Sequence, residues 1–150
     1  MVRKVVTWVV IADGARARIY RNDGPGKGLE AMPDLSMTGD RRKEREIMAD
    51  KPGRSFDSHG QGRHSMEPTT DPREILERQF LGELAETLQS AASAGEFDRL
   101  VLAAAPRALG ELREMMPRAV ADRISAEIAK DLTKLPSGDL PKHLADVMAV

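Results

Sequence analysis

The chain has 150 residues, a length that allows one domain with a substantial hydrophobic core. With 41% hydrophobic and 31% charged residues, the composition is typical of a folded soluble protein and excludes bulk disorder. The net charge of -1 excludes a global attraction to nucleic acid or membrane, so binding to a polyanion requires a local basic patch. The absence of cysteine excludes disulfides, thiolate catalysis and cysteine-ligated zinc. No apolar run approaches the roughly 20 residues that span a bilayer, so we expect a cytoplasmic protein without membrane insertion.

The first 35 residues predict an antiparallel β-meander. Residues 4–11 are rich in β-branched side chains, and residues 15–21 alternate between small or apolar and polar side chains. Between them, Asp13-Gly14 predicts a tight hairpin turn of the primed type, in which positive φ angles are required. A second turn at residues 22–28 precedes a weaker third strand within residues 29–35.

Residues 36–70 form a long polar segment without clear periodicity. Loops of more than about 12–15 residues are uncommon in compact domains and usually are functional or disordered. Between positions 40 and 64 seven cationic side chains outnumber five acidic ones: Arg41, Arg42, Lys43, Arg45, Lys51, Arg54 and Arg63 against Asp40, Glu44, Glu46, Asp50 and Asp57. Nearby glycines allow the backbone to approach phosphate closely. The segment therefore predicts either a loop that binds RNA or a solvated, flexible loop.

The second half of the chain predicts alternating helices and strands. Asp71-Pro72 is a helix start, and the apolar stripe that follows runs to a stop at Gly95. Residues 97–105 contain a run that is apolar on both faces, as in a central strand, and Pro106 opens another helix. Residues 119–135 fit a strand and a helix equally well, and a last helix is expected over residues 139–148.

Three further patterns have weak functional interpretations. Residues 24–28 read Gly-Pro-Gly-Lys-Gly, which lacks the phosphate-loop spacing and predicts a hairpin turn. His59 and His64 match no zinc-ligand pattern, so no metal site is expected. The junction at residues 105–107 places a helix N-terminus and Arg107 beyond a central strand, where open sheets often bind ligands, although Pro106 as a simple helix starter explains it as well.

Four segments together resemble the bacterial host attachment protein family, which is named for a requirement in the attachment of bacteria to host cells. They are residues 8–18 (WVVIADGARAR), 60–68 (GQGRHSMEP), 100–107 (LVLAAAPR) and 130–133 (KDLT). The family is similar to the middle domain of archaeal and eukaryotic peptide-chain release factors and of Pelota. That domain is a mixed α/β fold related to ribosomal protein L18.

The resemblance implies an α/β fold in which helices pack on a mixed β-sheet that begins with an antiparallel meander. It implies one domain over residues 1–150 with a long loop at 36–70, and it favours a strand within residues 122–132. In release factors the corresponding loop carries Gly-Gly-Gln and helps water to hydrolyse peptidyl-tRNA. Gly60-Gln61-Gly62 stands in that place here with a different glycine order.

The leading hypothesis is a non-enzymatic module that needs no cofactor and binds the ribosome or tRNA. A glutamine amide can orient water but cannot transfer protons, and no convincing nucleophile, base or metal accompanies it. The predicted RNA-binding residues are Arg41, Arg42, Lys43, Arg45, Arg54, Gly60, Gln61, Gly62, Arg63 and His64. One alternative is peptidyl-tRNA ester hydrolysis with Gln61 as the catalytic residue. The other is an adhesion or signalling protein that acts through protein contacts in attachment.

Overall fold

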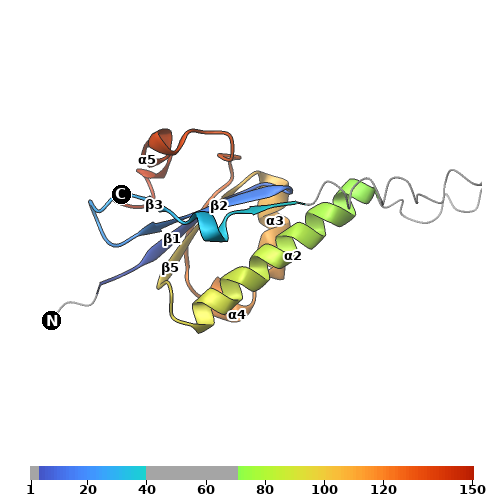
Figure 1. Cartoon of the computed structure of the whole chain (residues 1–150), viewed down its shortest axis with the longest axis horizontal. Helices are drawn as coiled ribbons and strands as arrows, with labels where there is room; N and C mark the ends of the chain where they lie inside the picture. Colours follow the sequence, from blue (N-terminus) through green and yellow to red (C-terminus); the bar gives the residue numbers. More distant parts are fainter. Residues whose placement is uncertain (1–3, 40–70) are drawn as a thin grey trace, which may run out of the picture.

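The computed structural model describes residues 4–39 and 71–150 of the chain (Figure 1). Within these residues, six strands form one sheet in the order β3-β2-β1-β5-β6, and β4 also pairs with β2. The strands are β1 (Thr7–Ala12), β2 (Arg16–Asn22), β3 (Glu30–Ala31), β4 (Met37–Thr38), β5 (Arg99–Ala104) and β6 (Ile124–Ile128). Strand β2 is antiparallel to β1, β3 and β4, whereas β1, β5 and β6 run parallel. The mixed α/β sheet with an antiparallel N-terminal part is therefore confirmed.

The two central strands are buried on both faces. Every residue of β1 is buried, and so is β5 from its second residue onward. Side chains of a strand point alternately to the two faces of the sheet, so a strand that is covered on both sides must be apolar throughout. Accordingly, Trp8 and Val10 belong to one hydrophobic cluster and Val9 and Ile11 to the other.

Helices α2 (Pro72–Ser93), α3 (Pro106–Met115) and α4 (Arg118–Ala121) cover the first face (Figure 1). Helix α2 begins as the sequence predicts, because Asp71 Oδ1 accepts a hydrogen bond from the Arg73 backbone N–H at 2.9 Å. It ends before Gly95, whose φ of +72° is the left-handed conformation that terminates helices. The apolar stripe of α2 packs against the sheet through Phe80, Leu84 and Leu88, among others.

The C-terminal part of the chain covers the second face. It includes the short 3₁₀ helix η5 (Ser137–Asp139) and helix α5 (Leu140–Leu144). Leu132, Leu140 and Leu144 are buried in the same cluster as Val9 and Ile11 of the sheet. The helix predicted over residues 139–148 is shorter than expected, because Val147 and Met148 pack against the cluster from a turn beyond its end.

Several details of the predicted meander are wrong. Gly14 does not have a positive φ, so the β1–β2 turn is not of the primed type. The predicted third strand is reduced to β3, because Pro33 lacks the N–H that a continuing strand needs and starts the 3₁₀ helix η1 (Pro33–Leu35). At the start of the segment predicted as a loop, β4 pairs with Arg16 and Ala17 of β2.

The structure also decides between the two alternatives for residues 119–135. The short helix α4 comes first, and β6 then adds to the parallel edge of β5. The strand lies within residues 122–132, where the family resemblance favours it. A bulge between Ile124 and Ala126 shifts the register, so that Ile124 packs against one hydrophobic cluster and Ala126 and Ile128 pack against the other.

The Gly-Pro-Gly-Lys-Gly stretch forms the turn between β2 and β3. Gly24, Gly26 and Gly28 all have positive φ. The buried Asn22 side chain holds the turn, accepting from Gly24 N at 3.1 Å and donating to the Gly28 carbonyl at 2.8 Å. The glycines thus serve the turn, and a strand follows them, not a helix that could present its N-terminus to phosphate.

Candidate functional site

Strands β1, β5 and β6 end at the same edge of the sheet because they are parallel. The chain leaves this edge as the β1–β2 turn after Ala12, as helix α3 after Ala104, and as residues 129–135 after Ile128. In open α/β sheets, ligands bind beyond the carboxyl ends of the parallel strands. We therefore describe this carboxyl edge as the candidate site.

The segments just before residue 40 and just after residue 70 both contact the β1–β2 turn at the carboxyl edge. On one side, the Gly39 backbone N–H donates to the Ala15 carbonyl at 2.6 Å. On the other side, Glu77 of α2 packs against Gly14 so closely that a Cβ on this glycine would lie 2.5 Å from Glu77 Cγ. The same turn therefore contacts the chain on either side of the predicted functional segment.

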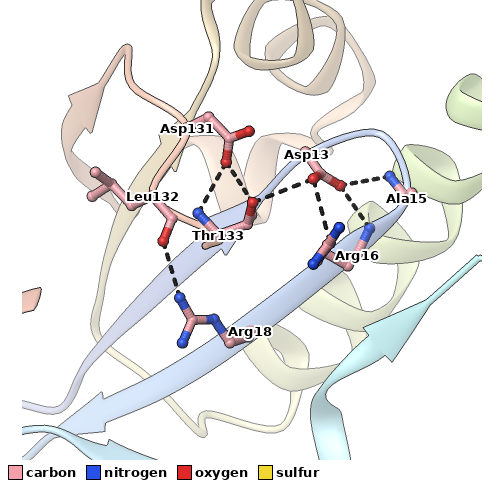
Figure 2. A network of polar contacts seen from close by, with 7 residues as sticks. All are labelled: Asp13, Ala15, Arg16, Arg18, Asp131, Leu132 and Thr133. Carbon is pink, nitrogen blue, oxygen red and sulfur yellow. Dashed lines mark hydrogen bonds and ion pairs between the residues drawn. The ribbon is translucent and has the colours of Figure 1, made fainter. Parts of the chain in front are cut away.

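Asp13 organises the turn through both of its carboxylate oxygens (Figure 2). Its Oδ1 accepts from the backbone N–H groups of Ala15 at 2.7 Å and Arg16 at 2.8 Å. Its Oδ2 accepts from Thr133 Oγ1 at 3.3 Å and lies 3.6 Å from Arg16 Nε. One side chain thus shapes the turn and joins it to the C-terminal part of the chain.

Thr133 lies between two carboxylates, as Figure 2 shows. It is only 5% exposed, and its backbone N and Oγ1 lie 2.9 and 2.5 Å from Asp131 Oδ1. Burial raises the pKa of Asp131, but the two Thr133 hydrogen bonds and the nearby Lys134 and Arg16 charges lower it more, so the net pKa lies below its usual value. Asp131 is therefore held as a carboxylate.

Arg18 of β2 fastens the C-terminal segment to the sheet. Its Nη2 donates to the carbonyls of Leu132 at 2.9 Å and Leu135 at 2.8 Å. Its Nη1 donates to the Tyr20 hydroxyl at 2.9 Å, and this hydroxyl lies 2.7 Å from Ser137 Oγ. These bonds satisfy carbonyls that would otherwise lose water when the segment covers the sheet.

The cation predicted at the start of α3 is engaged within the protein. Arg107 pairs with Glu74 of α2 at 2.8 Å and with Glu111 of its own helix at 3.4 Å. The hydrogen bond and charge of Glu74, and then those of Glu111, raise the pKa of Arg107. Residues 105–107 therefore act as a helix start that contacts α2.

The chemistry of the described edge is that of a scaffold. The Thr133 hydroxyl bonds to the carboxylates of Asp13 and Asp131. Arg16 lies beside Asp13, and Arg107 lies beside Glu74. No three histidine, aspartate or glutamate side chains gather as potential metal ligands within residues 4–39 and 71–150. Over the same residues, no helix has the length and apolarity needed to cross a membrane.

The site residues predicted from the sequence lie outside the described residues. They are Arg41, Arg42, Lys43, Arg45, Arg54, Gly60, Gln61, Gly62, Arg63 and His64, and the histidine at position 59 lies there too. The predicted loop at 36–70 is described only as far as Gly39. The role of these residues in binding RNA therefore stays a prediction.

The network at the carboxyl edge was missed by reasoning from the sequence. Asp13 and Thr133 are 120 positions apart, so no local pattern connects them. The only available signal was that both belong to segments that carry the family resemblance, ADGARAR and KDLT. In the structure these two segments meet.

Comparison with known proteins identifies one family. The model of a family described as "Protein required for attachment to host cells" matches residues 8–144. No curated protein sequence matches.

Among solved structures, 17 chains match. The archaeal translation termination factor aRF1 matches with a TM-score of 0.46 and 13% identity, covering 94% of this chain and 38% of the factor. A structure described as an archaeal protein also has a TM-score of 0.46, with 14% identity over 92% of this chain and 34% of the other. The chain thus spans little more than a third of the length of these structures.

Proposed function

The chain belongs to the family of proteins required for attachment to host cells, and we propose that it acts in the cytoplasm as a non-enzymatic module that binds ribosomal RNA or tRNA through residues 36–70. Its effect on attachment would then be indirect, through the synthesis of other proteins. Two features support the proposal: the excess of cations between positions 40 and 64, and the contacts of both flanks with the β1–β2 turn.

One observation carries the proposal: both flanks of residues 40–70 contact the same turn at the carboxyl edge of the sheet. Gly39 is hydrogen-bonded to Ala15, and Glu77 packs on Gly14. The intervening sequence has two more cations than acids between positions 40 and 64. A segment with an excess of cations, whose two flanks contact the same turn, is suited to contact a phosphate backbone, because a chain held at both sides loses less entropy on binding than a free tail.

The described edge adds little positive charge of its own. Arg16 lies beside Asp13, and Arg107 beside Glu74 and Glu111. The proposal therefore assigns the phosphate contacts to the segment, with Arg41, Arg42, Lys43, Arg45, Arg54, Arg63 and His64 as cationic or hydrogen-bonding groups and Gly60, Gln61 and Gly62 as the point of closest backbone approach.

The experiment is co-sedimentation with ribosomes and filter binding with tRNA over a series of salt concentrations. The test variant replaces Arg41, Arg42 and Arg63 by alanine. The control variant replaces Arg99, Arg118 and Lys142, three exposed cations elsewhere on the described surface, and so removes the same charge.

We expect affinity for RNA to fall as salt rises, because bound cations release counterions from phosphate. In the test variant, the slope of log K against log salt should become less steep by about 2–3, the value for three lost phosphate contacts, and the control should keep most of the slope. An affinity for RNA that changes neither with salt nor in the test variant would overturn the proposal.

Gln61 has no role in proton transfer in this proposal. A peptide-release assay on ribosomes that carry peptidyl-tRNA should therefore give equal rates with the wild type and with Gln61→Ala. A rate that depends on Gln61 would favour the hydrolytic alternative.

The description of the family favours a second candidate, a direct role in attachment through protein contacts. Labelling of intact cells with a reagent that does not cross the membrane distinguishes the two candidates. A surface protein would be labelled, whereas a cytoplasmic module should be labelled only after lysis.

A further inference from the structure

Strand β6 (Ile124–Ile128) is the last strand of the sheet, and within residues 4–39 and 71–150 it pairs only with β5. We infer that its outer edge is a dimerisation surface: β6 of one copy of the chain pairs antiparallel with β6 of a second copy about a two-fold axis, so that the two sheets become continuous. This inference goes beyond the proposed RNA binding and does not depend on it.

The two outer edges of the sheet differ in how they are protected. On one side, β3 and β4 have two residues each, and the 3₁₀ helix η1, which begins at Pro33, separates them. Short strands and proline are common means by which proteins prevent an edge from pairing with another chain. On the other side, β6 has five residues and no proline, and its bulge leaves residues 126–128 in regular pairing with β5. Strand β6 is therefore the edge that is open to a further strand.

The charged side chains along β6 contact their own chain and leave this edge unobstructed. Glu127 forms an ion pair with Arg113 of α3, whose Nε lies 3.2 Å from Glu127 Oε2. Arg123, just before the strand, donates from Nη1 to the Ala119 carbonyl at 3.0 Å, and its guanidinium carbon lies 5.9 Å from the centre of the Phe97 ring. Charges that project from an edge hinder pairing with another strand. Here both charges are directed toward the helical layer.

The β6 backbone has hydrogen-bonding groups that point to the outer side. The Leu100 N–H donates to the Arg123 carbonyl at 2.8 Å, so Leu100 and, two residues on, Leu102 direct their backbone groups toward β6. Glu127 lies opposite Leu102, and in a parallel pair a residue bonds to the two neighbours of the residue opposite it. The N–H and C=O of Glu127 therefore point away from β5, where a second strand could bond to them.

The apolar side chains of β6 are incompletely covered. Ile124 packs against the helical cluster, whereas Ala126 and Ile128 pack against the C-terminal cluster, and all three are only half-buried. In β5, which has a strand on either side, all residues after the first are buried. A strand added beside β6 would cover apolar surface on both faces of the sheet, which favours association.

The charges that flank β6 favour a second copy as the occupant of this edge. Asp122 and Lys130 lie equally far along the chain from Ala126, the central residue of the strand. In an antiparallel pair about a two-fold axis, the start of one strand lies beside the end of the other, so each Asp122 comes near the partner's Lys130.

Both of these flanking side chains are exposed and available for such a contact. Asp122 has a single pairing, at 3.8 Å, with the highly exposed Arg118. Lys130 forms no ion pair with another described residue. The net charge of -1 per chain adds little repulsion between two copies.

The first test is sedimentation equilibrium of the full chain over a wide range of protein concentrations. We expect a reversible equilibrium between monomer and dimer, weaker than that of a permanent dimer, because one short strand from each copy contributes a small interface. A chain that stays monomeric at all concentrations would overturn the inference and leave the edge to a strand of another protein.

The second test compares Glu127→Pro with Glu127→Ala. Both remove the ion pair with Arg113, but only proline also removes the outward N–H. We expect Glu127→Pro to raise the dimer dissociation constant about tenfold or more, through one lost hydrogen bond in each copy and the bulk of the ring at the interface. Glu127→Ala should stay close to the wild type. Equal dissociation constants in the two variants would overturn the pairing of backbone edges.

A charge exchange tests the antiparallel arrangement and does not depend on the folding of the proline variant. Lys130→Glu should raise the dissociation constant roughly two- to thirtyfold, as for the loss of two exposed ion pairs. Adding Asp122→Lys to the same chain should restore dimerisation. Lys142→Glu, which makes the same change of charge at an exposed position in α5, is the control and should have little effect. Failure of the double variant to recover would overturn the proposed arrangement of the two strands.

Discussion

Asp131 is an exposed carboxylate with a structural role, because Thr133 bonds to it with both its backbone N–H and its hydroxyl. Burial raises the pKa of Asp131, but these bonds and the nearby cations lower it more, so the pKa lies below its usual value. A pKa that is lower in the folded state means that the ionised group stabilises the fold. That contribution is complete above the unfolded pKa and is lost as pH falls through the folded pKa.

We therefore predict a pH-dependent effect of Asp131→Asn. Near pH 6 the variant should unfold at lower urea concentration than the wild type, and the difference should shrink as pH falls below about 4 and vanish near pH 2. Urea midpoints at several pH values measure this. Asp146→Asn, which removes an exposed carboxylate near the C-terminus, is the control. A difference that persists unchanged at pH 2 would show that the charge of Asp131 is not responsible.

Two glycines, one within helix α2 and one just beyond its end, should have opposite effects on stability when each is replaced by alanine. Gly95, beyond the end of the helix, has φ +72°, where a Cβ is strained. Gly82 lies within the helix, and a Cβ there would meet no atom within 4 Å. The same substitution therefore separates backbone strain from helix propensity.

Gly95→Ala should lower the free energy of unfolding by about 1 kcal/mol. Gly82→Ala should raise it by about 0.5–1 kcal/mol, because alanine restricts the unfolded chain and favours helix. Chemical denaturation of both variants measures these values. Equal signs for the two substitutions would contradict this account of the helix boundary.

The elements predicted most accurately are those whose signals are local. The start and end of α2 follow from Asp71, Pro72 and Gly95, and the strand at residues 100–104 follows from its uninterrupted apolar run. Residues 119–135 could not be assigned from periodicity, because the choice depends on the free edge of β5. Tertiary pairing outweighs local preference in such stretches.

In the described part of the chain, the sheet lies between a layer of helices and a C-terminal layer, and both layers pack on the central strands β1 and β5. Trp8 points to the helical layer, and its neighbour Val9 points to the C-terminal layer. A packing defect in either layer therefore loosens the same strand. The prediction, made from chain length, that residues 1–150 form one domain can be tested on these two layers.

Two core substitutions test it. Leu84→Ala in α2 and Leu144→Ala in α5 each remove a side chain that is 0% exposed, from opposite layers. Each should lower the free energy of unfolding by about 2–5 kcal/mol. Fluorescence of Trp8, the single tryptophan, and far-ultraviolet circular dichroism should follow one transition in both variants. A separate, earlier transition in Leu144→Ala would show that the C-terminal layer unfolds on its own.

The sequence by itself determined the α/β class, the well-capped α2, the central strand, the family and the segment in which function is expected. Each depends on composition, on neighbours within a few residues or on short sequence motifs. Only the tertiary structure decided that Asp13 bonds to Thr133, that Arg107 pairs with Glu74, and that Gly39 and Glu77 meet at one turn. These contacts join segments far apart in the chain, and the order of strands in the sheet, which no local pattern encodes, brings them together.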